Sequence, residues 1–584
     1  MPLKAAAAPK RKVSHSSASS TSGGHSSKKS RTATTTSSIV FQHYPPEMSN
    51  QRAQAYIDGD LPKPIDELTD ALEETAAQMH EVDPKDAMVH WFKSDLRTLD
   101  NRALAMASEK AQMAGVPLIG LYVVSPQDWE AHLTAPVRVD FVLRTLAVLQ
   151  RDLAELGIPL WMETVEQRKQ IPHRILSLMD KWGANHLFAN MEYEVDELRR
   201  ETAMVRQCAA QGKSMAVVHD ICVVPPGNLT SKSSGKAYAV YTPWFRAWKQ
   251  HVYTNEHILG PIDNPKTQAK TKTRWPAELM DCPIPSAPKG KTLGTKAEAK
   301  RFCTLWPAGE HEAMRRLEHF CDERVADYSD ERDFPAVEAT SSLSPYLAAG
   351  VLSARTVIRT ARDRTGAKTL DDGTEGFRVW ISEVSWRDFY RHILVAWPHV
   401  CFNKPFKLAY SGIAWSYNHD HFTAWTEGRT GYPIVDAAMR QLNKQGWLHN
   451  RCRMIVASFL AKDLLLDWRL GERYFMEHLV DGDFASNSGG WGFSASVGVD
   501  PQPYFRIFNP ILQSERFDPD GTYIRRWVPE LQDSGIADNK AIHEPYGRGF
   551  GDQARAAGYP EPIVQHKQAR EAALEAYKKA LSGN

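Results

Sequence analysis

A chain of 584 residues is too long for one hydrophobic core, so its length predicts two or more packed units. Its 71 basic and 70 acidic side chains nearly cancel, which excludes binding of a polyanion through a strong overall charge; a nucleic acid would have to meet a local patch. Seven scattered cysteines without a C-x-x-C pair argue against a disulfide framework and a structural zinc site, and no apolar run reaches the roughly 18 residues of a membrane span, so we expect a soluble intracellular protein without membrane contact.

The N-terminal segment is mostly Ser, Thr and Ala, a composition that buries too little apolar surface to fold. We expect residues 1–85 to form a disordered extension that carries a targeting signal. Basic clusters at residues 9–13 (PKRKV) and 28–31 (KKSR) are typical of nuclear import signals. The lack of acidic residues up to residue 40 is also typical of a mitochondrial transit peptide. We therefore predict a location in the nucleus, with the mitochondrion left open.

Short apolar runs alternate with helix-like segments between residues 86 and 220. These runs cover residues 87–92, 117–124, 158–161 and 186–189. Strands and helices that alternate at this spacing predict a parallel sheet with crossover helices, which is a Rossmann-like α/β domain. No G-x-G-x-x-G follows the first run, so an ordinary dinucleotide site is not indicated there.

Residues 221–310 contain many Pro, Gly, Ser and Lys residues and little periodicity, apart from the aromatic stretch at 241–248, so we expect a long interdomain linker. From residue 311 onward, helical periodicity continues almost to the end of the chain. The sequence therefore predicts an all-α second domain over residues 311–575, followed by a short C-terminal tail at 576–584.

Several hydroxyl groups precede a predicted helix start at Ser344 and Pro345. Ser followed by Pro is a favourable N-cap and N1 pair. A helix start with free backbone N–H groups can hold a phosphate, although plain helix capping is the commoner explanation of this pattern.

Another segment mixes chemical types on one predicted helix face. The residues at positions i, i+3, i+4 and i+7 of this helix are Glu383, Trp386, Arg387 and Tyr390. A carboxylate, an indole, a guanidinium and a phenol therefore share one side. This mixture is typical of a site that stacks an aromatic ligand and hydrogen-bonds its edge, and a surface helix with an incidental salt bridge is the alternative.

A predicted helical hairpin, over residues 432–460, carries polar groups into an apolar helix. Its second helix begins with a His, an Asn and two Arg residues at 449–453, and burying these groups is costly unless each is paired. A polar ligand or an acidic partner is therefore expected, and Asp481 and Asp483 are candidates. Metal binding is the rival hypothesis for these carboxylates, but a D-x-D without a bidentate Glu is a poor calcium site, so we expect no metal.

These segments resemble the photolyase and cryptochrome family, and within it the fungal-like class I photolyases, which split cyclobutane pyrimidine dimers in DNA with blue light. The resemblance covers roughly residues 87–535 and is carried by residues 91–97, 338–353, 379–393, 432–468 and 481–510. It implies a carbon–carbon lyase with an antenna-binding α/β domain and an all-α FAD-binding domain, in which FAD is bent into a U.

The resemblance also implies which residues bind the flavin, and Asn487 matches the position that faces flavin N5, where photolyases carry a neutral amide. The matched FAD-binding residues are Tyr328, Thr340, Ser341, Ser342, Leu343, Ser344, Asn450, Arg453, Asp481, Gly482, Asp483 and Asn487. The residues matched to the relay that carries electrons from the surface to oxidised flavin are Trp415, Trp468 and Trp491.

On the family pattern, Glu383 hydrogen-bonds a flipped-out dimer and Trp386 stacks on it. The residues matched to DNA contacts are Glu383, Trp386, Arg387, Tyr390, Asn450, Arg451 and Gln513. Repair of the (6-4) photoproduct relies on His at the two catalytic-site positions occupied here by Asn450 and Met454. Asn and Met cannot supply the proton which that reaction needs, so the cyclobutane dimer is the expected substrate. Phe493 replaces a Trp of bacterial relatives, and we expect this change to alter affinity.

Two residues match positions that bind an antenna pigment, namely Glu197 and Cys401. Asp196 and Phe402 replace the Asn and Lys of bacterial folate binders. We expect methenyltetrahydrofolate as the antenna, with a deazaflavin as the alternative.

The main alternative function is a cryptochrome-type blue-light receptor, alone or combined with repair. Such receptors often carry a long signalling tail, whereas only a short segment follows residue 531, where the resemblance fades. A flavin dehydrogenase is a further alternative, but the Rossmann fingerprint that it would need is missing. We expect a monomer that binds UV-damaged DNA.

Overall fold

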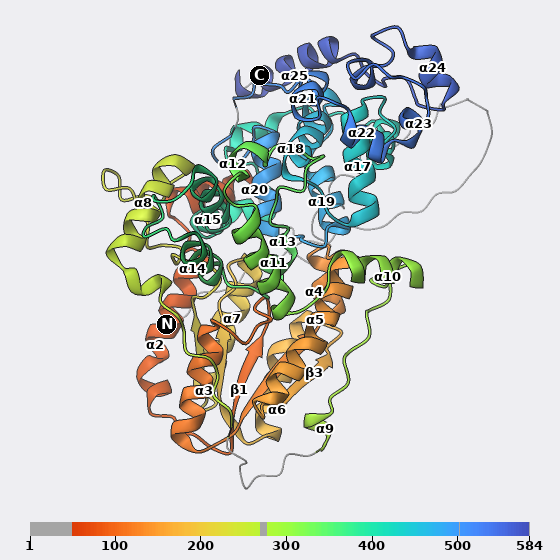
Figure 1. Cartoon of the computed structure of the whole chain (residues 1–584). Helices are drawn as coiled ribbons and strands as arrows, with labels where there is room; N and C mark the ends of the chain where they lie inside the picture. Colours follow the sequence, from red (N-terminus) through yellow and green to blue (C-terminus); the bar gives the residue numbers. More distant parts are fainter. Residues whose placement is uncertain (1–48, 269–276, 502, 583–584) are drawn as a thin grey trace, which may run out of the picture. The chain divides into compact units, whose positions relative to one another are not determined.

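The computed structural model describes residues 49–268, 277–501 and 503–582 (Figure 1). The basic clusters and the first 48 residues of the predicted targeting extension lie outside the described residues. The described chain forms an α/β domain followed by a helix-rich domain, as the sequence predicts.

The α/β domain is built on a five-stranded parallel sheet with the strand order β3-β2-β1-β4-β5. The strands are β1 (Ala87–Phe92), β2 (Leu118–Val124), β3 (Leu160–Thr164), β4 (Ala184–Asn190) and β5 (Ser214–Val218). All the side chains of β1 are buried, because helices cover both faces of a parallel sheet and its strands therefore appear as continuous apolar runs. The short β5, in which buried and half-buried residues alternate, was not predicted.

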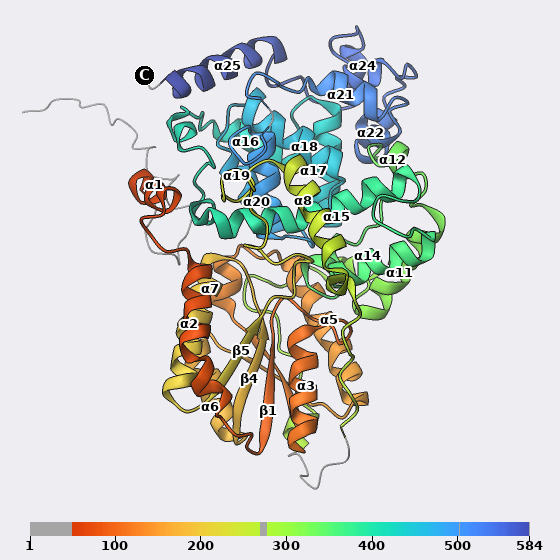
Figure 2. The same cartoon turned by 90° about the vertical axis from the view of Figure 1, so that its left-hand side faces the viewer.

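Helices lie on both sides of these strands, with α2 and α7 on one side and α3 and α5 on the other (Figure 2). The helices of this domain are α2 (Pro64–His80), α3 (Arg102–Ala114), α4 (Pro126–Ala131), α5 (Pro136–Glu155), α6 (Ile171–Lys181), α7 (Val195–Ala210) and the short α9 (Ala277–Met280), which contacts β3. The first helix, α1 (Asn50–Asp58), instead contacts residues 398–402 and 408–412 of the helix-rich domain. The predicted disordered extension is therefore wrong for α1 and α2. Apolar residues at helical spacing, such as Ile65, Leu68 and Ala71, give α2 a buried side that packs along α7.

The second domain is arranged around the long helix α15. Its helices are α8 (Tyr241–Thr254), α10 (Lys296–Leu305), α11 (Glu310–Glu323), α12 (Tyr328–Glu331), α13 (Ser344–Ala348), α14 (Ala354–Thr365), α15 (Glu375–Ala396), α16 (His419–Glu427), α17 (Pro433–Gln445), α18 (Asn450–Ser458), α19 (Trp468–His478), α20 (Phe484–Ser494), α21 (Pro510–Phe517), α22 (Thr522–Trp527), α23 (Pro529–Gln532), α24 (Gly551–Ala556) and α25 (His566–Ser582). Among the described helices, none combines the length and the apolar character that crossing a membrane requires.

Two further boundaries differ from the prediction. Within the predicted linker at 221–310, α8 packs on α15, and its Trp244 and Trp248 are buried. Within the predicted tail at 576–584, α25 continues to residue 582 and its Tyr577 is buried. Both errors have the same cause, because these aromatic side chains are covered by helices that lie far away in the sequence.

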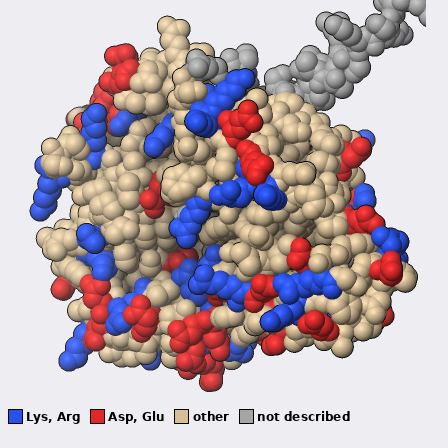
Figure 3. Space-filling model, turned by 90° about the horizontal axis from the view of Figure 1, so that it is seen from above, with Lys and Arg blue, Asp and Glu red and all other residues tan. Residues whose placement is uncertain are grey.

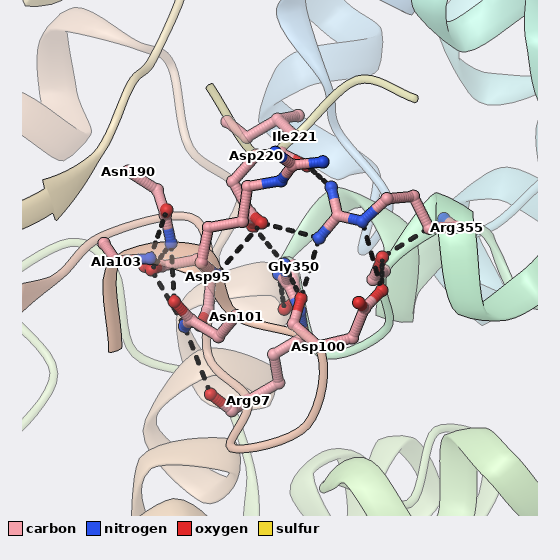
Figure 4. Close-up of polar contacts among 12 residues, drawn as sticks. Asp95, Arg97, Asp100, Asn101, Ala103, Asn190, Asp220, Ile221, Gly350 and Arg355 are labelled. Atoms are coloured by element: carbon pink, nitrogen blue, oxygen red, sulfur yellow. Dashed lines mark hydrogen bonds and ion pairs between the residues drawn. The ribbon is translucent and has the colours of Figure 1, made fainter. Parts of the chain in front are cut away.

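A buried network of charged and polar groups joins the two domains (Figure 4). Arg355, on α14, donates from Nη2 to Asp220 Oδ1 at 2.6 Å and to the carbonyl oxygen of Asp100 at 2.8 Å. Arg97, in the loop after β1, pairs with the same Asp220 and donates from Nη1 to the carbonyl oxygen of Gly350 at 3.0 Å. Both guanidinium groups therefore meet carboxylate charge in the interior, as buried ions require.

Gly350→Ala is expected to destabilise the contact between the domains. Gly350 has a φ of +66°, and a Cβ at this position would lie 1.9 Å from the carbonyl oxygen of Ser94, which belongs to the α/β domain. We expect the free energy of unfolding to fall by about 3 kcal/mol or more, measured by thermal or denaturant unfolding.

Gly366→Ala is the matched control. Gly366 also has a left-handed φ, of +71°, but a Cβ there would meet no atom within 4 Å. Only the backbone strain applies, so we expect a loss of about 1 kcal/mol. Equal losses in the two variants would contradict the close approach at Gly350.

Candidate functional site

The predicted mixed face lies on α15, and its first two residues lie near each other as expected. Glu383 is half-buried, and its Oε1 accepts a hydrogen bond from Arg332 Nη1 at 2.7 Å. The Trp386 indole stacks on the ring of Tyr241, with centroids 3.6 Å apart and planes 7° apart. Sequence reasoning missed Arg332 and Tyr241, although the aromatic stretch that begins at Tyr241 was a signal.

The other two residues of this face, Arg387 and Tyr390, contact the interior of the fold. Arg387 donates to the carbonyl oxygens of Ile221 at 2.9 Å and Leu347 at 3.0 Å, and burial lowers its pKa to about 10. Tyr390 lies against Gly489 of α20, where a Cβ would come within 2.2 Å of its ring. Both side chains are only half-buried, and their predicted contacts with DNA stay predictions.

The charged groups expected near the hairpin of α17 and α18 are paired. Arg453 donates from Nη2 to Asp481 Oδ2 at 2.8 Å, as predicted, and from Nε to the carbonyl oxygen of Leu448 at 2.8 Å. Asp483 pairs instead with Arg391 of α15. Burial alone would raise the pKa of Asp483, but Arg391, Arg387 and the hydrogen bonds from Ser486 together outweigh it and hold the pKa well below its usual range. The prediction that these buried charges need partners therefore holds, but the partner of Asp483 comes from α15 and not from α18.

The other groups at the start of α18 lie closer to solvent. Asn450 is exposed and Met454 is half-buried. Arg451 donates from Nη2 to Asp333 Oδ2 at 2.7 Å, and Gln513 is half-buried on α21. The predicted contacts of these residues with DNA stay predictions, and Asp333 is a partner that sequence reasoning missed.

The predicted phosphate-binding segment leads into α13 with a shift of one residue. Leu343 occupies the N-cap position and Ser344 is the first helical residue, so the prediction of Ser344 as the cap is wrong. Ser344 Oγ instead accepts a hydrogen bond from Trp447 Nε1 at 3.1 Å. Residues 340–342 are half-buried, and Ser342 has a φ of +50°, which is uncommon outside glycine.

Gly490 of α20 borders open space, and predicted flavin-site residues lie on the same helix. Asp483 caps this helix by accepting from the backbone N–H of Ser486 at 2.9 Å, and Asn487 and Gly490 follow at helical spacing. A Cβ on Gly490 would meet no atom within 4 Å, and Asp481 Oδ1 is buried without a hydrogen-bond partner in the described chain. Open space and an unpaired acceptor fit a large polar cofactor such as FAD. The remaining matched residues, Tyr328 and Gly482, are buried.

The three predicted relay indoles differ in exposure. Trp491 and Trp468 are 2% and 4% exposed, whereas Trp415 is half-buried. Trp491 fits against α19 because Gly471 leaves room for it, and a Cβ there would lie 2.0 Å from the indole. Trp415 meets Tyr577 of α25 edge-on at 5.9 Å. The ring contacts of the described residues do not join any two of the three indoles directly, but their exposure increases toward Trp415, as a path to the surface requires.

A cavity of about 170 Å³ lies where the sheet meets the helical domain. Residues after β1, β2 and β4 line it, and the strand order reverses between β1 and β4, which is where open α/β sheets bind ligands. Glu197 and Asp483 also line this cavity. The predicted antenna residue Cys401 is instead buried in an apolar cluster with Val195 and Phe402. The two predicted antenna residues therefore do not share this cavity.

Charged groups around Glu197 balance one another. His132 Nε2 lies 3.0 Å from Glu197 Oε1. Burial acts to lower the pKa of His132, but Glu197 outweighs it and raises the pKa to about 9. The positions of Asp128, His132 and Glu197 would suit one metal ion, but Arg168 lies 3.0 Å from Asp128 and 3.4 Å from Glu197 and supplies positive charge there. This arrangement favours an organic ligand over a metal.

Sequence reasoning also missed Glu472, a carboxyl group on α19 that is only 4% exposed. Its backbone carbonyl accepts from Asn487 Nδ2 at 3.0 Å, while its Oε1 has no hydrogen-bond partner in the described chain. Burial raises the pKa of Glu472 to about 8. No local pattern signals this residue, because its burial depends on how α19 packs on α20.

Comparison with known proteins gives consistent matches. The model of DNA photolyase matches residues 88–266, and the model of the FAD binding domain of DNA photolyase matches residues 380–579. The deoxyribodipyrimidine photo-lyase of Neurospora crassa is 60% identical over 93% of this chain and 90% of that protein. The mitochondrial deoxyribodipyrimidine photo-lyase of Saccharomyces cerevisiae is 34% identical over 92% and 94%. The crystal structure of a class III photolyase from Agrobacterium tumefaciens has a TM-score of 0.73 at 35% identity and covers 85% of this chain and 98% of that one.

Glu472→Gln is expected to remove a pH-dependent loss of stability. Below pH 4.5, which is the ordinary pKa, the Glu472 carboxyl is protonated in both the folded and the unfolded chain. Between pH 4.5 and about 8, the unfolded chain releases the proton, whereas the folded chain retains it. The free energy of unfolding of the wild type therefore falls as pH rises through this range. The neutral Gln lacks this effect, so we expect the variant to gain about 4 kcal/mol on the wild type between pH 4.5 and 8, as measured by thermal unfolding. Parallel curves of stability against pH would contradict the proton on Glu472.

Proposed function

Because this chain belongs to the DNA photolyase family, we propose that it is an enzyme that splits cyclobutane pyrimidine dimers in DNA with the energy of light. The reaction breaks carbon–carbon bonds and restores two pyrimidines, so the enzyme is a lyase. The observation that carries this conclusion is the 60% identity to the deoxyribodipyrimidine photo-lyase of Neurospora crassa over 93% of this chain, which spans both domains.

The helical domain is an FAD-binding domain, and reduced FAD, when bound and excited by light, supplies the electron that enters the dimer and later returns. The open space beside Gly490 of α20 and the hydroxyls of residues 340–342 suit the cofactor. Asn487 contributes a neutral amide, which carries no acidic proton. The residues proposed to hold FAD are Tyr328, Thr340, Ser341, Ser342, Leu343, Ser344, Asn450, Arg453, Asp481, Gly482, Asp483 and Asn487.

The lesion pocket is proposed to form around Glu383 and Trp386. Arg332 holds the Glu383 carboxylate at 2.7 Å, so this acceptor is in place before a dimer is flipped out of the duplex. The indole offers a flat face for one base. Asn450 and Met454 cannot donate the proton that (6-4) repair needs, which supports the cyclobutane dimer as substrate.

DNA binding is proposed to depend on local contacts. Figure 3 shows basic and acidic side chains interspersed over one face of the molecule, in keeping with 71 basic and 70 acidic side chains in the whole chain. This face therefore lacks an electrostatic field of a single sign that would attract the phosphate backbone. The residues proposed to contact damaged DNA are Glu383, Trp386, Arg387, Tyr390, Asn450, Arg451 and Gln513.

The antenna pigment is proposed to lie in the cavity beside Glu197, with methenyltetrahydrofolate as the first choice and a deazaflavin as the alternative. His132, which Glu197 keeps protonated, is a donor for an acceptor atom of the pigment. Cys401 lies outside this cavity. The absorption spectrum of the purified protein checks this proposal, because a bound pigment adds a band to the flavin spectrum and Glu197→Ala should remove it.

The basic clusters at residues 9–13 and 28–31 support a location in the nucleus, with the mitochondrion as the alternative. The name of the yeast relative assigns that protein to the mitochondrion. We propose that the enzyme acts as a monomer. The matched fungal relatives are named as repair enzymes, so the cryptochrome-type receptor, alone or combined with repair, is the less supported alternative.

Illumination of the reduced protein with a dimer-containing oligonucleotide is expected to restore thymine absorbance. Glu383→Ala should lower the repair yield about tenfold while FAD stays bound, because the lesion loses a hydrogen-bond acceptor that acts as charge develops. Glu375→Ala is the control, since Glu375 lies on the same helix but is exposed and pairs with Arg378. An unchanged yield in Glu383→Ala, or a wild-type protein that takes up no FAD, would refute the assignment.

Trp468→Phe is expected to slow the photoreduction of oxidised flavin by about tenfold or more, because Phe does not pass on an electron as readily as an indole. Repair by protein that has been reduced chemically beforehand should be unchanged. Trp425→Phe is the control, since Trp425 is also buried and meets Trp491 at 6.1 Å but does not match the relay. Transient absorption after a laser flash measures both variants, and a normal rate in Trp468→Phe would count against the relay.

A further inference from the structure

We propose that Tyr241 is a positioning residue of the lesion pocket, which covers one face of Trp386 and leaves a single indole face for a damaged base. Tyr241 is the first residue of α8, in the segment that the sequence predicts to be a linker. The inference rests on the proposed function, in which Trp386 stacks on the dimer.

Trp386 is the last ring of an aromatic column, which consists of Trp248, Phe245, Tyr241 and Trp386. The Trp386 and Tyr241 rings are 3.6 Å apart with planes at 7°. Tyr241 and Phe245 follow at 5.5 Å and 11°, and Phe245 and Trp248 at 5.9 Å and 25°. Because these planes are nearly parallel, the indole continues a stack that α8 provides.

The remaining ring neighbours of Trp386 meet it at larger angles. Phe389 meets the indole edge-on at 85°, and Tyr390 is tilted by 37°. Among the ring contacts of the described residues, Tyr241 is thus the one ring that lies parallel to the indole. One face of Trp386 is therefore taken before any DNA binds.

The column is anchored to α15, the same helix that carries the indole. Tyr241 Oη lies 2.8 Å from the carbonyl oxygen of Ser382 and 2.7 Å from Ser385 Oγ. Burial raises the pKa of Tyr241, so its phenol keeps the proton that it donates. At the other end, Trp248 Nε1 donates to Asp388 Oδ2 at 3.1 Å. The column cannot shift along α15 without breaking these hydrogen bonds.

A fixed indole lowers the entropic cost of lesion binding. A side chain that becomes immobilised on binding loses rotamer freedom in that step, whereas a side chain that is already held has lost it during folding. Stacking with a base needs a π-face that another ring does not cover, and Trp386 is half-buried with Tyr241 as its one parallel ring neighbour among the described residues. In this proposal, one base of the dimer stacks on the uncovered face of Trp386, and the other base of the dimer hydrogen-bonds the Glu383 carboxylate.

The test compares two replacements of Tyr241 in the full chain with FAD bound. In Tyr241→Leu we expect the Kd for a dimer-containing duplex to rise about tenfold, while the Kd for undamaged DNA and the FAD content stay unchanged. Repair at saturating lesion concentration should change by less than about twofold, since the effect is on binding. Tyr241→Phe keeps the ring and loses the bonds to Ser382 and Ser385, so its Kd should rise about threefold.

Two further variants make the result decisive. Tyr253→Leu is the matched control, because Tyr253 lies on α8 and donates to Asp371 at 2.8 Å but is not part of the column. Its Kd should match the wild type. Trp386→Leu is the reference for the pocket. Weakened dimer binding in Trp386→Leu together with wild-type binding in Tyr241→Leu overturns the positioning role.

The same variants separate this inference from the proposed function. Wild-type dimer binding in both Trp386→Leu and Tyr241→Leu would show that the lesion pocket lies elsewhere. If Tyr241→Leu does not fold, Tyr241→Phe carries the test alone. A ratio of damaged to undamaged affinity equal to that of the wild type then overturns the inference.

Discussion

Asp220 accepts hydrogen bonds from two arginines that belong to different domains, and the rest of the site depends on this buried pairing. Burial alone would raise the pKa of Asp220, but Arg97 and Arg355 outweigh it and hold the pKa low. A buried ion that loses its partner is strongly destabilising, so each domain completes the charge balance of the other. The carboxyl edge of the sheet, the cavity beside Glu197 and the helices around α15 are thereby held in one arrangement.

The sequence predicted those elements whose pattern is local. The apolar run of β1 is typical of a strand that is buried on both faces, and the helical periodicity after residue 311 corresponds to the helices around α15. It did not predict α2 or α8, because their stability comes from packing on α7 and α15, which lie far away in the chain. A short aromatic stretch gives no sign of the distant helix that covers it.

The same limit applies to the candidate site. The pairing of Arg453 with Asp481 was predictable, because a buried charge needs a partner and few acidic residues were suitable. Spacing on α15 showed that Glu383, Arg387 and Tyr390 share a face, but not that the last two also contact neighbouring elements. Contacts between helices decide which part of a shared face stays open, and the sequence of one helix does not contain them.

The aromatic column behind Trp386 affects how the lesion pocket discriminates between damaged and intact DNA. A normal base in a duplex has a neighbour above and below it, so moving onto the indole would exchange two stacking partners for one. Two bases that are covalently joined in a dimer already stack poorly in the duplex, so the free energy needed to flip them out is lower. An indole with one face covered by Tyr241 can therefore replace the reduced stacking of a damaged base. It cannot replace the two stacking partners that an intact base has in the duplex.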